Sequence, residues 1–339
     1  MKTTLFLTNR NTLAKIAAIC ITIILIAILF TQISLEDITQ TLRQINPVFL
    51  LAGFLLYVGC YLFRTLRFYY LLNEEISVRE LFPIICLHNL INQILPAKTG
   101  ELSYIYLIKK IHDRTIGEGI ATLFLARMFD VISISVLFLV SFIFVLPSLT
   151  TNRGVVYTVI IILGVFIGIL FLFLYKARFC LKIVSAFLSF IHAGTTKTGD
   201  FILRKGAETI PVLERARSGG KYSYLVLFGL SLCIWGALYS FTIVLVIAMN
   251  IHLSLPAMIF ACSFGFMTAI LPVQGIGNFG TFEAGWTAGF LSVGLPAELA
   301  ISTGFSYHII NLLFNVLLGV YGYFSINRAG LKRSAGTNE

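Results

Sequence analysis

Two short segments of the sequence place a proline, glycines and a glutamate inside otherwise apolar stretches. The first, from Leu95 to Glu101, reads LPAKTGE, and the second, from Leu271 to Glu283, reads LPVQGIGNFGTFE. Proline removes a backbone donor and glycine adopts turn conformations that other residues resist, so we expect each segment to interrupt a helix. The backbone N–H groups exposed where a helix restarts can bind an anion such as a phosphate.

The first break carries side chains suited to holding a phosphate. Lys98 supplies a positive charge beside the exposed N–H groups, and Glu101 would orient Lys98 or a nearby arginine. The alternative for Glu101 is the ordinary stabilisation of a helix start by an acid in its first turn. Glu283 is its counterpart in the second break and has the same two interpretations. Asn89 and Asn92 either cap the first break or contact the ligand, and the sequence leaves both open.

A further charged pair lies within an apolar segment, where an ionised group is costly and needs a reason. Arg127 and Asp130 are three residues apart and so share one face of a helix. They either neutralise each other and hold helices together, or Arg127 contacts an anion while Asp130 orients it. The planar guanidinium matches a phosphate through two hydrogen bonds, which suits arginine to the second role.

The predicted substrate-binding residues come from both breaks and from this pair. They are Asn92, Pro96, Lys98, Gly100, Glu101, Arg127, Asp130, Pro272, Gly275, Gly277 and Glu283. Trp235 and Trp286 are expected to pack rather than to contact a ligand. The six cysteines and five histidines show no metal-ligand spacing, and the glycines at 275–280 lie in an apolar stretch without a strand. We therefore expect no metal, no cofactor and no catalytic residue.

Other polar residues of the apolar segments have structural explanations. Arg64 and Arg67 end a helix and are expected to extend to the membrane interface, although Arg64 is deeper and would line the entrance of the first break. His308, Asn311 and Asn315 follow helical spacing, which is typical of hydrogen bonds between membrane helices.

The composition identifies the bilayer as the main solvent of this chain. Of the 339 residues, 58% are hydrophobic and 12% are charged, whereas soluble domains have about 25% charged residues. The net charge of +10 comes from basic residues between apolar blocks. Orientation in the membrane and contact with anionic lipid headgroups explain it better than nucleic acid does.

Six apolar stretches are each long enough to cross the membrane as a helix, at about 20 residues per crossing. They are Leu13–Ile33, Val48–Leu66, Gly119–Leu146, Val155–Tyr175, Tyr224–Met249 and Glu298–Phe324. The first follows Lys2 and Arg10 and so resembles a signal peptide, but no small-residue cleavage site follows it. We expect it to remain as a membrane helix. The predicted fold class is all-α and polytopic.

The two interrupted stretches, Leu81–Ile108 and Leu255–Leu291, are predicted to be re-entrant helical hairpins. The arm Leu81–Ile94 is about 21 Å long, short of a hydrocarbon core of about 30 Å. The linker Lys176–Tyr222 holds nine basic and three acidic residues, a net charge of +6 (9 − 3), and should be cytoplasmic. Six crossings and two hairpins place the linker and both termini in the cytoplasm, whereas eight crossings place the linker outside.

Residues 1–329 are predicted to form one membrane domain, with 330–339 as a short cytoplasmic tail. Two units of helix, hairpin and helix, at about 48–146 and 224–324, have opposite orientations, separated by the amphipathic linker 176–222. Inverted repeats of this kind place a substrate site near the middle of the membrane. The alternative is two unrelated kinked helices.

The linker alternates basic and apolar residues over Lys176–Ile191, as expected for a helix in the membrane interface. Polar turns are expected at Gly194–Gly199 and Ser218–Gly220, on either side of a second amphipathic stretch.

The order of these motifs resembles the lysylphosphatidylglycerol synthase transmembrane-region family, also called flippase-like. The matching motifs are Leu95-Pro96, Gly100-Glu101, Arg127-x-x-Asp130, Leu271-Pro272, Gly275-x-Gly277 and Glu283. The resemblance covers about residues 13–324. In bifunctional relatives this region precedes a cytoplasmic aminoacyl-transferase domain and is implicated in moving the aminoacylated lipid across the bilayer. Stand-alone relatives are linked to glycolipid, polyprenyl-phosphate or phospholipid handling. Lys98 and His308 depart from the family pattern and leave the lipid open.

The resemblance implies a translocator of an anionic or phosphate-bearing lipid, such as a phospholipid or a polyprenyl-phosphate-linked glycolipid, in the inner (plasma) membrane. Lys98, Arg127 and the break N–H groups would hold the headgroup, and Glu101, Asp130 and Glu283 are candidate proton carriers. Because the sequence contains no transferase domain, enzymatic activity is not expected. One alternative is a membrane component of lipid modification whose partner is a membrane-bound lipid-modifying enzyme. Another is a structural or assembly subunit.

Overall fold

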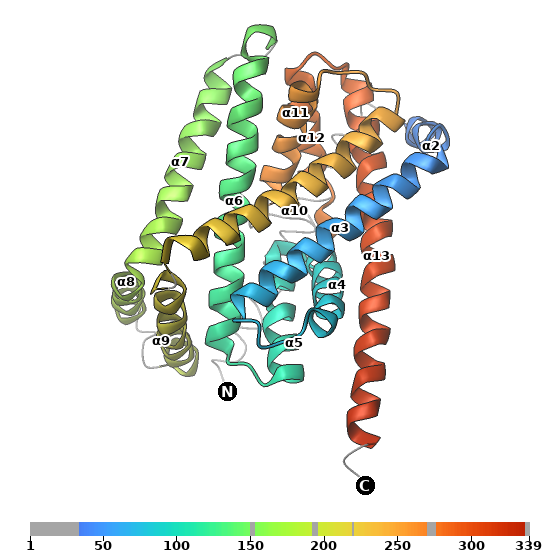
Figure 1. Ribbon diagram of the computed structural model, residues 1–339. Helices are drawn as coiled ribbons and strands as arrows, with labels where there is room; N and C mark the ends of the chain where they lie inside the picture. The colour runs from blue at the N-terminus through green and yellow to red at the C-terminus, as the bar shows by residue number, and fades with distance from the viewer. Residues whose placement is uncertain (1–33, 150–152, 192–195, 219, 270–275, 336–339) are drawn as a thin grey trace.

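The computed structural model of the protein is a bundle of helices (Figure 1). It describes residues 34–149, 153–191, 196–218, 220–269 and 276–335. All regular elements within these ranges are helical, which confirms the all-α prediction. The predicted first membrane helix, Leu13–Ile33, lies outside the described residues.

Five helices of the described chain are long and apolar enough to cross a membrane. They are α3 (Pro47–Leu71), α6 (Ile116–Val145), α7 (Arg153–Tyr175), α10 (Gly220–Ala248) and α13 (Ala297–Ala335). Each coincides with a predicted crossing. Helix α13 continues well past its predicted end at Phe324 and includes residues 330–335 of the predicted tail. The chain is therefore a multi-pass membrane protein.

Local signals explain where these helices begin. Helix α3 follows Asn46, whose side chain accepts a hydrogen bond from the backbone N–H of Val48, with Pro47 at the first helical position. A short helix that the sequence reasoning missed, α2 (Leu35–Arg43), begins at a reciprocal cap formed by Ser34 and Asp37. The serine and the acid three residues later were its available signal.

The first predicted break is confirmed. Helix α4 (Val78–Ile94) ends directly before Leu95, the 3₁₀ turn η1 (Pro96–Glu101) follows, and α5 (Leu102–His112) resumes after it. Leu95 is extended, with ψ of 134°, as expected for a residue that precedes proline.

The second predicted break is confirmed as well. Helix α11 (Leu255–Thr268) ends before it, η3 (Ile276–Asn278) lies within it, and α12 (Thr281–Ser292) begins after it. Gly277 and Gly280 have φ of +64° and +84°, conformations that favour glycine.

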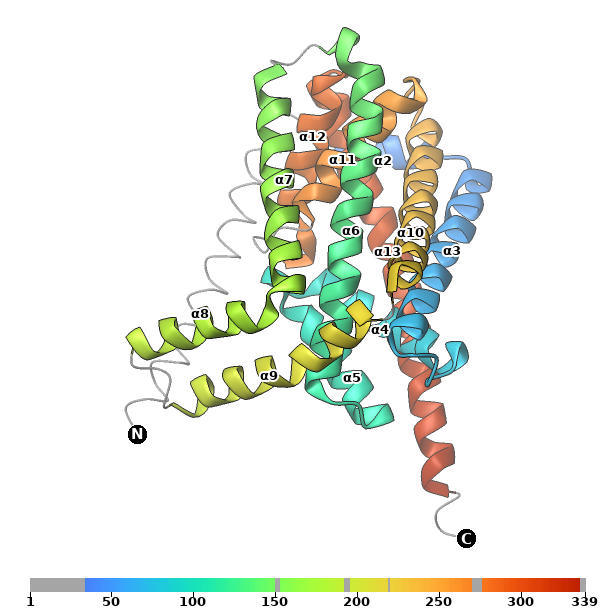
Figure 2. The same ribbon diagram turned by 60° about the vertical axis from the view of Figure 1, so that its left-hand side comes forward.

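The two interrupted segments lie toward opposite ends of the bundle, as both ribbon views show (Figures 1 and 2). Helices α4 and α5 are at the end where the C-terminus lies, and α11 and α12 pack together toward the other end. Helix α3 packs along α10, and α4 packs against α13. Elements from the two halves of the sequence are thus interleaved around the centre.

The linker forms two helices, α8 (Ala177–Phe190) and α9 (Lys197–Ser218), which project sideways from the bundle (Figure 2). Helix α8 exposes apolar residues such as Phe187 and Phe190, which suits the predicted location of this segment in the membrane interface. Helix α9 already includes Lys197–Gly199, so the predicted turn at Gly194–Gly199 is too long. Ser218 and Gly220 were predicted as turn residues, but both are helical.

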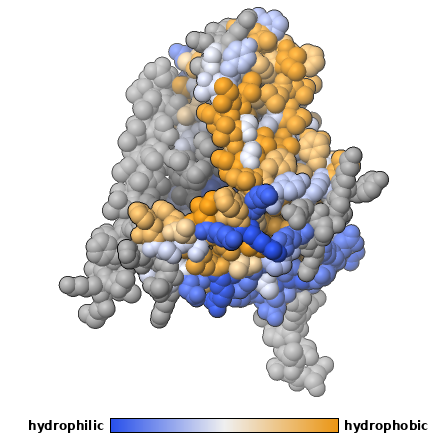
Figure 3. Space-filling model, turned by 90° about the vertical axis from the view of Figure 1, so that its left-hand side faces the viewer, coloured by the Kyte–Doolittle hydropathy of each residue, from blue (hydrophilic) through white to orange (hydrophobic). Residues whose placement is uncertain are grey.

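The surface changes in character along the bundle (Figure 3). On the face that Figure 3 shows, apolar residues dominate the upper part, and hydrophilic residues gather at the lower end, toward the level of α8 and α9. Helix α7 is almost wholly uncovered: 6% of its apolar window is buried. An apolar surface of this size is stable only against another apolar phase, which a bilayer supplies.

Candidate functional site

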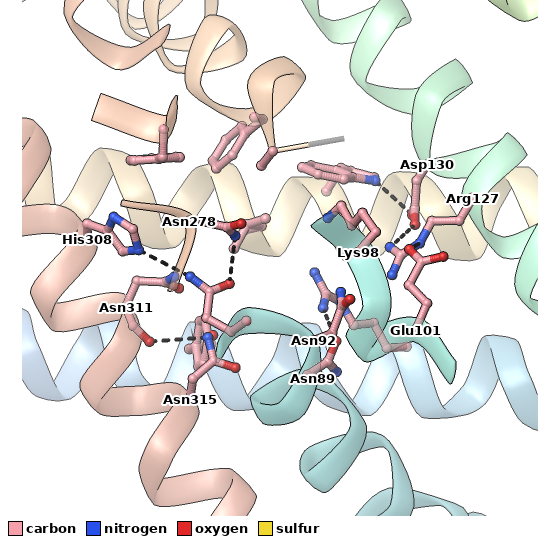
Figure 4. A pocket seen from close by; sticks show the side chains of 18 of the residues that line it. Asn89, Asn92, Lys98, Glu101, Arg127, Asp130, Asn278, His308, Asn311 and Asn315 are labelled. Atoms are coloured by element: carbon pink, nitrogen blue, oxygen red, sulfur yellow. Dashed lines mark hydrogen bonds and ion pairs between the residues drawn. The ribbon is translucent and has the colours of Figure 1, made fainter. Parts of the chain in front are cut away.

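A polar cavity of about 140 Å³ lies between the two breaks (Figure 4). One water site needs about 10–15 Å³ by the same kind of measure, so the space accommodates several waters or a compact headgroup. Its walls come from α3, α4, η1 and α6 in the first half of the chain and from α10, α11, η3, α12 and α13 in the second.

One end of the cavity is lined by ionised side chains. Arg127 of α6 donates from Nε to Glu101 Oε1 at 2.8 Å, and its Nη1 lies 3.3 Å from Asp130 Oδ2. The arginine therefore links the first break to the long helix α6. Figure 4 shows these three side chains grouped together with Lys98.

Asp130 has its shortest contact with an arginine that does not line the cavity. Arg67 Nη1 lies 2.6 Å from Asp130 Oδ1, and the two residues are 3% and 4% exposed. Trp235 donates its indole N–H to the same oxygen at 3.0 Å. The prediction that Arg67 extends to the interface is wrong, because the buried Asp130 carboxylate needs a fully desolvated counter-ion. Trp235, predicted only to pack, holds this carboxylate and lines the cavity.

Two further cations line the cavity without a carboxylate partner in the described parts of the chain. Arg64 Nη1 donates to Asn89 Oδ1 at 2.9 Å, and Asn89 in turn donates to the Ile85 carbonyl. Lys98 has no hydrogen bond or ion pair there through its ammonium group. The described residues of the cavity lining thus include three cations and two carboxylates, an excess of one positive charge (3 − 2) with histidine neutral.

Lys98 has an unusual backbone, with φ of +57°. For an L-residue with a long side chain this left-handed conformation costs about 1–2 kcal/mol. The strain is a local signature of a constrained site.

The other end of the cavity is lined by neutral polar groups. Gln93 Nε2 lies 3.2 Å from His308 Nε2, and Gln93 Oε1 accepts from Asn278 Nδ2 at 3.2 Å. Asn311 and Asn315 continue this lining along α13. These contacts join helix α4, the second break and the last helix.

Glu283 lies behind this wall. Its Oε1 lies 2.5 Å from His308 Nδ1, and its Oε2 accepts the backbone N–H of Gly280 at 2.7 Å. The side chain is completely buried. The helix-start interpretation of Glu283 is confirmed by the Gly280 contact, and the carboxylate also orients His308.

The predicted binding residues divide into three groups. Asn92, Lys98, Glu101, Arg127 and Asp130 line the cavity together. Pro96, Gly100, Gly277 and Glu283 shape its surroundings without lining it. Pro272 and Gly275 lie outside the described residues.

Gly100 shows how the break is held. A Cβ at this position would lie 2.7 Å from the Ile91 carbonyl oxygen and would also meet the backbone of Asn92. Only glycine allows η1 to approach α4 this closely, and that approach carries Lys98 and Glu101 to the cavity.

Several lining residues were missed or given a structural role only. Asn89, Asn92 and Gln93 share one face of α4, and this spacing was a usable signal for Gln93. The predicted interhelical bonds of His308 and Asn315 exist, to Glu283 and Tyr61, yet both residues also line the cavity. Trp286, in contrast, is fully buried, as predicted.

The fold and the cavity define a class: a multi-pass helical membrane protein with a charged polar cavity between two helix breaks. The chain matches the family described as "Lysylphosphatidylglycerol synthase TM region" over residues 15–319, and it belongs to this family. The family ties the protein to membrane lipids. No curated protein and no solved structure matches the chain.

Proposed function

We propose that the protein translocates a membrane lipid with an anionic or phosphate-bearing headgroup, and that the cavity holds this headgroup during transfer. The proposal rests on two cations, Arg64 and Lys98, which line the cavity. Neither forms an ion pair with a carboxylate among the described residues. An uncompensated positive charge at membrane depth is costly. An anionic headgroup is the group that a lipid bilayer offers to balance it.

Arg127 would complete the anion site. Its Nε is taken by Glu101 and one Nη by Asp130, which fixes the plane of the guanidinium. A pre-oriented guanidinium can present its remaining N–H groups to a phosphate without further loss of side-chain entropy. The two carboxylates thus position the arginine and partly neutralise it, so that the site can release its ligand.

The proposed membrane arrangement has six crossings and two re-entrant hairpins that enter from opposite faces. Helix α4 has 17 residues and α11 has 14, which gives lengths of about 25 and 21 Å at 1.5 Å per residue. Both are shorter than a hydrocarbon core of about 30 Å. The basic linker then supports a cytoplasmic location for both termini in the inner (plasma) membrane.

Transfer would proceed by alternating access between the two inverted halves. The hydrogen bond from Trp235 to Asp130 and the contacts of Gln93 with His308 and Asn278 connect elements of both halves. Their exchange would open the cavity toward one face and then the other. Movement would be downhill or coupled to protons carried by Glu101, Asp130 or Glu283.

The proposal is tested with purified protein reconstituted in vesicles that contain phosphatidylglycerol labelled on its acyl chain. We expect the protein to equilibrate the label between leaflets and Arg64→Gln to slow this at least tenfold, because a charged hydrogen bond contributes about 1.5–3 kcal/mol. Arg178→Gln is the matched control, since Arg178 is an exposed linker residue paired with Glu214.

A labelled polyprenyl-phosphate lipid forms a second arm of the same assay. Protein that is folded by thermal unfolding criteria and moves neither lipid would contradict the proposal. Equal rates for Arg64→Gln and Arg178→Gln would contradict the assignment of the anion site.

A further inference from the structure

The cavity is chemically divided, with the ionised groups at one end and uncharged hydrogen-bonding groups at the other (Figure 4). We infer that the headgroup carries hydroxyl groups beyond its phosphate and bears no positive charge, as in a phosphodiester of a polyol or a sugar. This inference rests on the proposed function and names the substrate class of the same site.

Two buried acceptor atoms at the cavity have no hydrogen-bond partner among the described residues: Oδ1 of Asn278 and Oδ1 of Asn92. Asn278 is 6% exposed. Buried polar atoms in proteins nearly always have a partner, so each of these requires a donor. A phosphodiester anion has no O–H or N–H group and cannot supply one, whereas a hydroxyl can.

The direction of the hydrogen bonds supports the acceptor role of Asn278. The Glu283 carboxylate accepts from Gly280, and the contact of His308 Nδ1 at 2.5 Å makes that nitrogen the second donor. In neutral His308 the other ring nitrogen is then an acceptor, and it receives the Gln93 amide N–H.

The same chain of donors and acceptors continues to the cavity. Because the amide N–H₂ of Gln93 donates to His308, its Oε1 faces Asn278 and accepts from the Asn278 N–H₂ at 3.2 Å. The Asn278 oxygen is left as the free acceptor at the end of the chain. Glu283 is therefore a positioning residue: it acts through His308 and Gln93 to set which atom Asn278 offers to the ligand.

A cationic headgroup is disfavoured by the same contacts. In the part of the chain that the structure describes, three carboxylates near the cavity already accept from protein donors. Glu101 accepts from Arg127, Asp130 from two arginines and Trp235, and Glu283 from His308 and Gly280. Among the described residues, a headgroup ammonium would have to share a carboxylate that already accepts from a protein donor, and it would face the excess positive charge. The cavity therefore offers acceptor oxygens to a neutral hydroxylated headgroup but offers no matching counter-ion among the described residues to the ammonium of an aminoacylated or ethanolamine headgroup.

Binding of matched lipid pairs to the detergent-solubilised full chain, measured by native mass spectrometry, tests the inference. Phosphatidylglycerol and phosphatidylpropanol have the same charge and carbon count and differ by two hydroxyls. We expect phosphatidylglycerol to bind about tenfold more tightly, as one or two net hydrogen bonds predict. Lysyl-phosphatidylglycerol is expected to bind more weakly than phosphatidylglycerol.

A second pair separates the two sources of a hydroxylated phosphodiester. It compares a polyprenyl-phosphate-linked hexose with the polyprenyl phosphate methyl diester. Discrimination in this pair alone identifies a glycolipid, and discrimination in the glycerol pair alone identifies a glycerophospholipid. Either result supports the inference.

Variants connect the discrimination to the named atoms. Asn278→Gly keeps the left-handed backbone (φ +63°) and removes the acceptor, and Asn250→Gly is its control, at an Asn with φ +60° in an exposed position after α10. Asn278→Gly and Asn92→Leu should each reduce the ratio of phosphatidylglycerol affinity to phosphatidylpropanol affinity, whereas Asn250→Gly should leave this ratio as in the wild type. Glu283→Gln should reduce it too, because an amide facing His308 reverses the chain of donors.

The outcomes separate this inference from the proposed function. Equal binding of the matched pairs, or lysyl-phosphatidylglycerol binding as tightly as phosphatidylglycerol, overturns the inference while leaving anionic lipid as the cargo. Absence of binding to every anionic lipid overturns the proposed function and the inference together. A preference that survives in Asn278→Gly and Asn92→Leu also overturns the inference, because other groups then read the hydroxyls.

Discussion

Each break places one residue with a left-handed backbone at the cavity, and neither is glycine. Lys98 of the first break has φ of +57° and Asn278 of the second has φ of +63°. Asparagine tolerates this conformation, whereas lysine does so at a cost. A strained lysine that lines a cavity indicates that its charge matters more there than its contribution to stability. This also explains why a small or polar residue is the ordinary expectation at position 98.

Replacement of Lys98 should therefore separate stability from function. We expect Lys98→Asn to have a free energy of unfolding about 1 kcal/mol higher, because the backbone strain is relieved, and so to unfold at a higher temperature. The same variant should translocate anionic lipid several-fold more slowly. Thermal unfolding in detergent and the vesicle assay measure the two effects. Lys98→Arg is the control that keeps the charge and the strain. A Lys98→Asn protein that transports lipid as the wild type does would remove Lys98 from the anion site.

At the scale of elements, the cavity depends on how closely the 3₁₀ turn η1 approaches helix α4. The approach is possible because Gly100 has no side chain, and a Cβ there would meet the backbone of α4 rather than a flexible side chain. The backbone of α4 cannot move aside as the end of a flexible side chain can. The position of the whole first break relative to α6, and with it the contact between Glu101 and Arg127, follows from this one glycine.

Alanine substitutions test this dependence directly. Gly100→Ala should destabilise the protein by about 1–3 kcal/mol through overpacking and should weaken anionic lipid binding. Gly59→Ala on α3 is the matched control, because a Cβ there meets nothing within 4 Å; it should be neutral or stabilising by up to about 1 kcal/mol. Unfolding midpoints of the two variants are compared. Equal midpoints would show that η1 can move away from α4 without cost.

At the scale of the whole molecule, the arrangement of the two breaks gives a testable topology. Lys110 lies near the end of α5, and His252 lies between α10 and α11. These ends of the bundle are opposite in both ribbon views (Figures 1 and 2). If the breaks are re-entrant hairpins that enter from opposite faces, the two positions lie on opposite sides of the membrane.

Single cysteines at these two positions, in a background where the six native cysteines are replaced by serine or alanine, check this topology. Lys110→Cys should react with an impermeant thiol reagent only from the cytoplasmic side, as its basic surroundings predict. His252→Cys should react only from the outer side. Labelling of intact cells against inverted membranes measures both. Reaction of both positions from one side would exclude the arrangement of six crossings and two hairpins.

The sequence by itself determined the membrane class, the long helices and the position of both breaks. These follow from local properties: the length of apolar runs, the missing N–H of proline and the backbone freedom of glycine. It also indicated five side chains that line the cavity, because an ionised or amide group in an apolar segment stands out wherever the segment folds. It did not predict α2, although Ser34 and Asp37 carried the signal.

Only the tertiary structure decided which of these groups meet. Arg67 pairs with Asp130 across 63 residues, and Gln93 reaches His308 across 215. Spacing along the chain contains no information on such contacts, since they depend on how α3, α6 and α10, and likewise α4 and α13, pack against one another. Buried polar groups then require buried partners. Arg67 points into the bundle because Asp130 is buried, and Glu283 and His308 contact each other because neither is accessible to water. The division of the cavity into an ionised and a neutral end is the result.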